Sequence, residues 1–251
     1  MPVRPGAEPF AHDGSPTGVL VVHGFSGSPI SVRPWGEHLA AAGYTVRLPR
    51  LPGHGTTWQE MNRTRWEDWY AAAERSFLEL TDRCDRVFVA GLSMGGGLAT
   101  LLAERHGPAV AGLVLVNPAI RVEDVRLHAL PVLHRLVPSL AGIGNDIKKE
   151  GADEGAYDRV PLKALHSQVG AWKALIRDLP SVTQPLLVFR SAVDHVVPAS
   201  STALLLSRVS STDVTEVVLE DSYHVATLDN DAPRIFEGSV GFIERVAAPA
   251  H

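Results

Sequence analysis

The segment Gly91-Leu92-Ser93-Met94-Gly95 has the composition and spacing of a turn that presents a serine nucleophile. It lies between an apolar, β-branched run at 86–90 and a helix-forming run at 96–104, and this order of strand, turn and helix is the context that a nucleophile elbow requires. Glycines allow a turn tight enough to lift the hydroxyl off the strand end, and the following helix directs free N–H groups and a positive dipole towards the reacting atom. The pattern therefore predicts that Ser93 is a nucleophile.

A serine hydroxyl is a poor nucleophile at neutral pH, so Ser93 needs a nearby base and a third group that orients the base. Asp194 follows an apolar run at 185–190, and His224 follows another at 214–219. We predict that His224 takes the serine proton and returns it to the leaving group, while Asp194 holds the imidazole tautomer and stabilises its cation.

The chain contains 11 histidines, and three others are candidates for the base. His195 adjoins the acid and is expected to point elsewhere in its turn, and His54 lies in a Pro- and Gly-rich turn that suits a structural role. His23 closes the first strong strand and is expected to support the loop after it. Asp221 and Asp229 are the distant alternatives to Asp194.

Acyl transfer also needs hydrogen-bond donors for the developing oxyanion, and losing one such donor can cost roughly 3 kcal/mol. The backbone N–H of Met94, directly after the nucleophile, is one expected donor. The second is expected from the loop 23–29, where glycines on both sides of Phe25-Ser26 allow the backbone to turn an amide inward. The N–H of Phe25 is the best candidate there.

Apolar runs and helical spacings alternate along most of the chain, which predicts an α/β fold with a mostly parallel central sheet and helices on both faces. Ligands of such sheets gather at the carboxyl ends of the strands. The expected strands are 18–23, 44–48, 86–90, 110–116, 185–190 and 214–219, and the clearest expected helices are 32–42, 65–80 and the run after Ser93.

Between Asn117 and Ser181 the alternation stops and no convincing strand is found. A structureless loop of that length would be implausible in a compact domain. We expect a small, mainly helical cap at about 118–180, inserted into a single domain spanning 1–251 and lying above the strand ends. The alternative is an ordinary crossover helix with long loops.

Length and charge narrow the class of protein. A chain of 251 residues with a net charge of −5 is large enough for one substantial core and lacks the basic balance of nucleic-acid-binding proteins, so no nucleic-acid partner is expected. No run of 18 apolar residues is found, and residues 1–6 lack the apolar core of a signal peptide, which predicts a cytoplasmic protein. The single cysteine, Cys84, is expected to be a small core hydrophobe.

With these residues assembled, the chain resembles the α/β-hydrolase superfamily and, within it, bacterial monoacylglycerol lipases and related small carboxylesterases. The resemblance is carried by five segments: 23–27, 48–56, 91–96, 194–198 and 222–229. It implies hydrolysis of the ester between glycerol and one fatty acid through an acyl-serine intermediate, with no cofactor and no metal. It further implies that Ile143 and Glu154 line the pocket and that Glu154 hydrogen-bonds the glycerol hydroxyls. A solvated surface acid is the alternative for Glu154.

Two other readings stay open. A general carboxylesterase acting on short- to medium-chain acyl esters would need the same triad, and a noncatalytic binding module of this fold would normally lack one of its members. Dehalogenases and epoxide hydrolases place an acid at the elbow and dienelactone hydrolases a cysteine, so Ser93 argues against them.

The expected ligand is a small lipid ester. An apolar cap also favours transient contact with a micelle or membrane surface. The oligomeric state and the acyl chain length stay undetermined.

Overall fold

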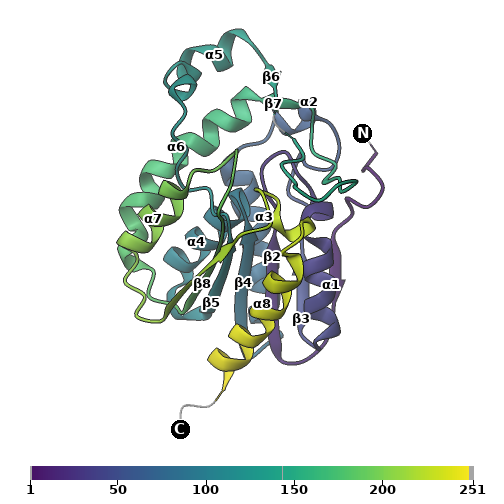
Figure 1. Cartoon of the computed structure of the whole chain (residues 1–251), viewed down its shortest axis with the longest axis vertical. Coiled ribbons are helices and arrows are strands. Elements are labelled where there is room, and N and C mark those ends of the chain that lie inside the picture. Colours follow the sequence, from purple (N-terminus) through teal and green to yellow (C-terminus); the bar gives the residue numbers. More distant parts are fainter. Residues whose placement is uncertain (1, 143, 249–251) are drawn as a thin grey trace.

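A seven-stranded sheet forms the centre of the computed structural model, which describes residues 2–142 and 144–248. The strand order is β1-β3-β2-β4-β5-β8-β9, with every neighbouring pair parallel except β1 and β3 (Figure 1). The strands are β1 (Phe10–His12), β2 (Thr17–Val22), β3 (Thr45–Leu48), β4 (Arg86–Leu92), β5 (Val110–Val116), β8 (Leu186–Ser191) and β9 (Val214–Leu219).

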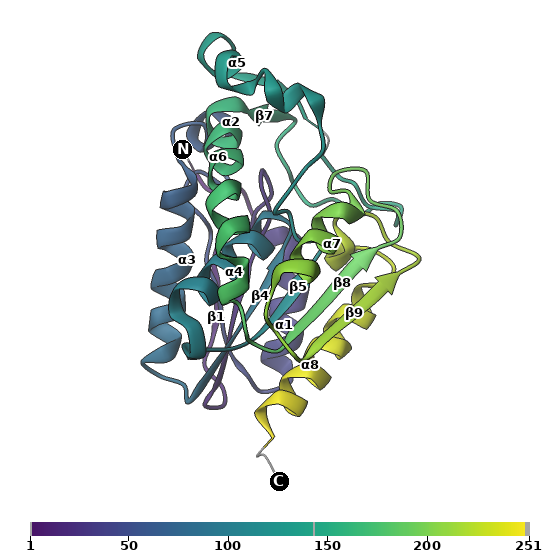
Figure 2. The same ribbon diagram turned by 90° about the vertical axis from the view of Figure 1, so that its left-hand side faces the viewer.

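Helices cover both faces of this sheet (Figure 2). The helices are α1 (Arg33–Ala41), α2 (Trp58–Met61), α3 (Trp66–Thr81), α4 (Met94–His106), α5 (Leu130–Leu136), α6 (Leu162–Asp178), α7 (Ala199–Arg208) and α8 (Ala232–Ala247). None of the helices in the described ranges is long and apolar enough to cross a membrane.

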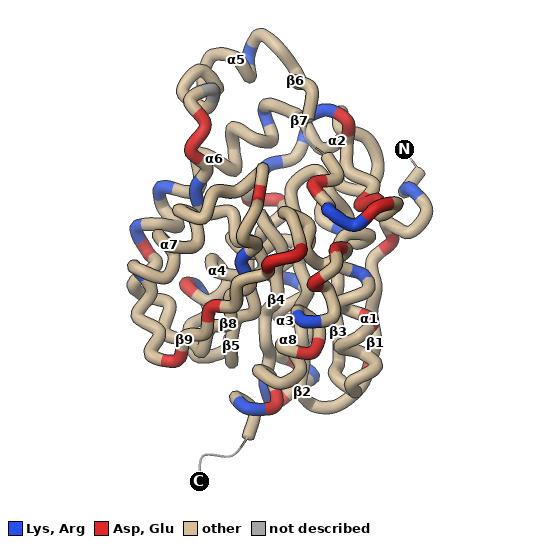
Figure 3. Tube along the Cα trace, viewed as in Figure 1, with Lys and Arg blue, Asp and Glu red and all other residues tan. Residues whose placement is uncertain are grey.

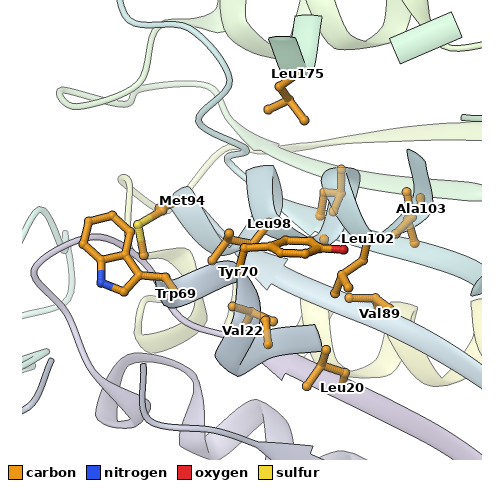
Figure 4. Packing of buried hydrophobic residues seen from close by; sticks show 14 of the residues in the cluster. Leu20, Val22, Trp69, Tyr70, Val89, Met94, Leu98, Leu102, Ala103 and Leu175 are labelled. Carbon is orange, nitrogen blue, oxygen red and sulfur yellow. The ribbon is translucent and has the colours of Figure 1, made fainter. Parts of the chain in front are cut away.

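The continuous apolar runs become strands that are buried on both faces. In β2, Leu20 and Val22 pack with α3 and α4 in one core, whereas Val19 and Val21 pack with α1 and α8 in the other. This division follows from the two-residue period of a strand, which sends successive side chains to opposite faces. Figure 4 shows the α3 and α4 side of this packing, where Trp69, Tyr70, Leu98 and Leu102 lie against β2 and β4.

The predicted α/β architecture is confirmed, with three differences in detail. The edge strand β1 was not predicted, because three partly exposed residues carry no periodic signal. Helices α7 and α8 were also not identified. Within the segment expected to be mainly helical, residues 125–136 are divided into a 3₁₀ turn at Val125–His128 and the α-helix α5, which has a proline in its first turn.

The segment between β5 and β8 also contains a two-stranded antiparallel sheet, β6 (Ser139–Ala141) with β7 (Arg159–Pro161). The expectation of no strand between Asn117 and Ser181 was therefore wrong, because strands of three residues are too short to show a pattern. Helix α6 packs into the core beside α3 and α4 through Trp172 and Leu175, and α5 lies at the far end of the molecule against α6. The boundaries of a cap at about 118–180 stay a prediction.

Candidate active site

Ser93 lies at the tight turn between β4 and α4 and has backbone angles of φ +56° and ψ −118°. Positive φ is unfavourable for a residue with a side chain and costs on the order of 1–3 kcal/mol. Hydrogen bonds from the Ser93 N–H to Val116 O (2.9 Å) and from the Ala119 N–H to Ser93 O (3.0 Å) hold the strained residue in place.

The glycines of the elbow are needed for close packing of backbone on backbone. A Cβ atom on Gly91 would lie 2.3 Å from the carbonyl oxygen of Gly95, and a Cβ atom on Gly95 would lie 2.1 Å from that of Val22. Both contacts are shorter than any side chain tolerates. The predicted reason for glycine at these positions is therefore confirmed by the local geometry.

The structure brings Ser93, His224 and Asp194 together at the carboxyl ends of β4, β8 and β9. The Ser93 Oγ lies 2.9 Å from His224 Nε2, and His224 Nδ1 lies 2.7 Å from Asp194 Oδ2. The side chains of His224 and Asp194 are 8% and 6% exposed, so the hydrogen-bonded chain is shielded from water. Because the carboxylate accepts from Nδ1, Nε2 is left free to accept the serine proton.

The charges of His224 and Asp194 stabilise each other. Burial disfavours the imidazolium of His224, but the charge and hydrogen bond of Asp194 outweigh it and raise the pKa of His224 above its ordinary value. Burial also disfavours the Asp194 carboxylate, yet His224 and the N–H groups of Val196 and Val197, at 2.8 and 2.7 Å, lower the pKa of Asp194. Asp194 is thus a charged acceptor for the Nδ1–H group of His224.

The rival residues have other partners. His195 is 53% exposed and its Nδ1 lies 2.7 Å from Asp146 Oδ1. Asp229 is buried and accepts backbone N–H groups from residues 148, 149, 223 and 230. Asp221 pairs with Lys148 at 2.6 Å on the surface. Among these acids, Asp194 is the one hydrogen-bonded to His224.

His23 is buried and fixes the peptide that precedes Phe25. Its Nε2 accepts the Leu51 N–H at 3.2 Å, so the ring proton is on Nδ1, which donates to the Gly24 carbonyl at 3.0 Å. Burial lowers the pKa of His23 to about 4, so the ring is neutral at ordinary pH. In a trans peptide the N–H points opposite to the C=O, and the N–H of Phe25 is therefore directed away from His23.

Gly24, the residue before Phe25, and Met94 both adjoin Ser93. Gly24 lies against Ser93, since a Cβ atom on Gly24 would be 3.3 Å from the Ser93 Cβ. Met94 is the first residue of α4, whose N-terminal N–H groups have no intrahelical acceptor. Within the part of the chain that the structure describes, neither the N–H of Phe25 nor that of Met94 donates to another protein group.

Sequence reasoning missed Asp146, which lies in the irregular segment 144–158 before β7. Its Oδ2 accepts the backbone N–H groups of His195 (3.1 Å) and His224 (3.2 Å), and its carbonyl accepts the Val225 N–H (3.0 Å). One carboxylate thus joins the loop that carries Asp194 to the loop that carries His224. A single acid in a loop has no periodic signal, so the sequence alone gives no indication of this role.

Asn117, directly after β5, is a second residue that sequence reasoning did not identify. It is buried with φ +44°. Its amide donates to Ser191 Oγ (3.0 Å) and to the carbonyl of His224 (2.8 Å), and its side-chain oxygen accepts the Ser191 N–H (2.8 Å). Asn117 thereby anchors the histidine loop to the sheet.

Glu154, one of the two expected substrate-binding residues, lies partly buried beside the loop after β2. Its Oε1 accepts the Asn145 N–H at 3.0 Å, and a Cβ atom on Gly27 would be 3.5 Å from its Oε2. Burial raises the pKa of Glu154, and the positive charge that His224 can carry opposes the rise. Ile143, the other expected residue, lies outside the described residues.

The arrangement suits nucleophilic acyl transfer: a buried serine, a base hydrogen-bonded to it, a carboxylate behind the base and two candidate backbone donors. Across residues 2–142 and 144–248, no group of three or more His, Cys, Asp or Glu side chains is placed to hold a metal ion. A cavity of about 840 Å³ lies between α3, α4 and α6, and its lining contains none of the three triad residues.

A doubly wound sheet with a serine at the turn after β4 defines the α/β-hydrolase class. Residues 15–231 match the sequence profile of the family described as Serine aminopeptidase, S33, and the chain belongs to this family of α/β-hydrolases.

Three similar proteins give the comparison more detail. The chain is 42% identical to a thermostable monoacylglycerol lipase of Bacillus sp. (strain H-257), over 98% of each chain. It is 25% identical to a carboxylesterase of Bacillus subtilis (strain 168), over 95% of this chain and 97% of the relative. A solved structure from work on two metagenome-derived lipolytic enzymes, LipS and LipT, superimposes with a TM-score of 0.94 at 44% identity, covering 97% of this chain and 100% of the other.

Proposed function

We propose that this protein is a serine ester hydrolase that cleaves monoacylglycerols into glycerol and a free fatty acid. The observation that carries the chemistry is the Ser93–His224–Asp194 hydrogen-bonded chain at a strained turn, with distances of 2.9 and 2.7 Å. The choice of substrate is supported by the full-length similarity to a monoacylglycerol lipase.

In the proposed mechanism, His224 Nε2 takes the proton of Ser93 as Oγ attacks the ester carbonyl carbon. The carbon–oxygen bond to glycerol then breaks, and the imidazolium gives its proton to the departing glycerol oxygen. Water attacks the acyl-serine in the second half, with His224 again taking and returning one proton, and the fatty acid leaves. Asp194 holds Nδ1–H throughout and stabilises the cation.

The two backbone donors supply the stabilisation that the transition state needs. As the carbonyl carbon becomes tetrahedral, its oxygen gains negative charge and accepts the N–H groups of Phe25 and Met94. His23 contributes indirectly, because its hydrogen bond to Gly24 O fixes the peptide that carries the Phe25 N–H. The donor is thereby oriented before the substrate arrives.

Glycerol recognition is proposed for Glu154. One of its oxygens is held by Asn145, while Oε2 lies beside Gly27 in the loop that carries Phe25. A carboxylate can accept hydrogen bonds from both hydroxyls of a diol. Ile143 is proposed as an apolar wall for the same ligand.

Transient contact with aggregated lipid is a separate proposal, and it concerns the cap. Val132 and Leu136 of α5 are 63% and 75% exposed there.

The alternative is a general carboxylesterase, which is favoured by the 25% identical carboxylesterase relative. Hydrolysis of a panel of monoacylglycerols, diacylglycerols, triacylglycerols and short p-nitrophenyl esters distinguishes the two, with Ser93→Ala as the control. We expect the highest kcat/KM on monoacylglycerols and no turnover in the variant. Activity confined to short aryl esters would reject the monoacylglycerol assignment, and full activity of Ser93→Ala would reject the mechanism.

A further inference from the structure

A concave cluster of basic side chains lies away from the triad, at the end of the molecule that carries α5 (Figure 1). A cavity of about 370 Å³ is lined by Arg65, His134, Arg135, Lys163 and His166. They come from α5, the start of α6 and the residue before α3. Figure 3 shows basic segments at α5 and beside β7, at the end of the molecule opposite the C-terminus. We call these five residues the basic basin.

None of the five residues that line the basin is an acid. Over the described part of the chain, none of its three permanent cations (Arg65, Arg135 and Lys163) forms an ion pair with a carboxylate. Arg65 donates to the backbone carbonyls of Asn62 and Thr64 through Nη1, which leaves its other N–H groups free. Three like charges gathered on one concavity repel each other, so a bound anion would stabilise the arrangement.

The two histidines of the basin add unused polar atoms. Their rings stack with centroids 4.0 Å apart and an interplanar angle of 17°. Neither ring nitrogen of His134 has a hydrogen-bond partner among the described residues, although both are shielded from solvent. Burial and then the neighbouring positive groups lower the pKa of His134. An anion in the basin would give this ring the acceptor that it lacks.

The number and type of donors favour phosphate over carboxylate. One arginine satisfies a carboxylate with two parallel hydrogen bonds, whereas a phosphate group offers several oxygens in a tetrahedral arrangement to donors from different directions. The basin offers two guanidinium groups, one ammonium group and two imidazoles from separate elements. That donor set matches a phosphate group.

The setting of the basin identifies the source of the phosphate. Helix α5 also presents Val132 and Leu136 to solvent, 63% and 75% exposed, and these residues are one helical turn apart and share a face. An exposed apolar edge next to unpaired cations is the pattern of a surface that binds an anionic bilayer. We propose that the basic basin binds the phosphate headgroups of anionic phospholipids and docks the cap on a negatively charged membrane surface.

The overall charge of the protein makes this proposal specific. With a net charge of −5, the molecule as a whole is repelled by an anionic surface, so any preference for anionic lipid has to come from a local site. The preference should also weaken as salt is added, because exposed charges are screened over about 10 Å at 0.1 M ionic strength.

Vesicle co-sedimentation tests the proposal with vesicles of pure phosphatidylcholine and with vesicles that also contain phosphatidylglycerol. The test variant is Arg135→Gln/Lys163→Gln. The matched control is Lys173→Gln/Arg208→Gln, which removes the same charge at two exposed positions outside the basin. Turnover of soluble p-nitrophenyl acetate, expected to be equal in all three proteins, shows that each is folded.

We expect the parent and the control to bind the phosphatidylglycerol vesicles more tightly than the neutral ones, with the difference lost at high salt. The basin variant should bind the anionic vesicles roughly 10- to 30-fold more weakly. Equal binding of the parent to both vesicles, or equal losses in the basin variant and the control, would overturn the proposal. So would thermal stabilisation of the parent by inorganic phosphate without any preference for anionic vesicles.

Discussion

The nucleophile elbow and the irregular segment 144–158 both contribute to the site, but they are held in different ways. The elbow is fixed by backbone packing within the sheet, where Gly95 touches Val22 and the N–H of Ser93 donates to Val116. The segment 144–158 is joined to the site through the carboxylate of Asp146, which accepts the backbone N–H groups of His195 and His224. The nucleophile is therefore encoded locally, whereas the contribution of the segment 144–158 depends on a side chain that reaches distant loops.

The largest expected loss of kcat comes from replacing His224, the base that is hydrogen-bonded to the serine of the elbow. His224→Gln should lower kcat by roughly 10⁶-fold, because among the described residues His224 is the base hydrogen-bonded to Ser93 Oγ. His195→Gln is the matched control, since His195 is the neighbouring histidine of the site and pairs with Asp146 rather than Ser93. A comparable loss of kcat in both variants would contradict the assignment of the base.

The backbone packing of the elbow can be broken by one methyl group. Gly95→Ala places a Cβ atom 2.1 Å from the Val22 carbonyl, so α4 must shift away from β2, and we expect a loss of about 1–3 kcal/mol in the free energy of unfolding. Gly170→Ala is the control: it lies within α6 with no atom near the new methyl group and should raise stability by about 0.5–1 kcal/mol. Thermal unfolding of both variants measures the contrast, and equal midpoints would show that the close approach is not needed.

Replacing Asp146 should lower kcat less than replacing His224 does, but more than replacing an exposed acid does. Asp146→Ala removes the acceptor shared by His195 and His224, and hydrogen bonds to a charged group contribute about 1.5–3 kcal/mol. We expect kcat to fall roughly 10- to 100-fold with KM nearly unchanged, and the acid limb of the pH profile to move to lower pH because Asp146 raises the pKa of His224.

Glu150→Ala is the control for Asp146, because it removes one negative charge from the same segment at an exposed position. It should leave kcat and the pH profile unchanged. If Asp146→Ala behaved like this control, Asp146 would be a surface acid rather than a positioning residue.

The same contrast explains how much could be predicted from the sequence. The turn at Ser93 could be predicted because the strain, the glycine spacing and the flanking elements are all local. Asp194 and His224 could be predicted because they follow strands with clear apolar patterns. Asn117 and Asp146 could not be found in this way, because each acts through hydrogen bonds to loops 74 to 107 residues away for Asn117 and 49 to 78 for Asp146. The strands β6 and β7 were missed for a related reason, since pairing across 17 residues leaves no local periodicity.

Glu154 gives the smallest expected effect and tests whether the cap contributes to specificity. Glu154→Gln keeps the shape of the side chain but removes its charge, so KM for monoacylglycerols should rise by roughly 5- to 10-fold, within the range of a weakened charged hydrogen bond. KM for p-nitrophenyl acetate, which has no glycerol hydroxyls, should stay the same. Equal changes in KM for both substrates would mean that Glu154 supports the loop and does not bind glycerol.

The pH profile of this variant adds a second, independent readout. His224 acts as a base only when neutral, so kcat/KM rises with pH through the pKa of His224, which lies above the ordinary value of histidine. The negative charge of Glu154 contributes to this raised pKa of His224. Its removal lowers the pKa of His224, so the neutral form persists to lower pH and the acid limb moves in that direction. An unmoved limb would show that Glu154 is uncharged in the free enzyme, which the burial of its carboxyl group would then explain.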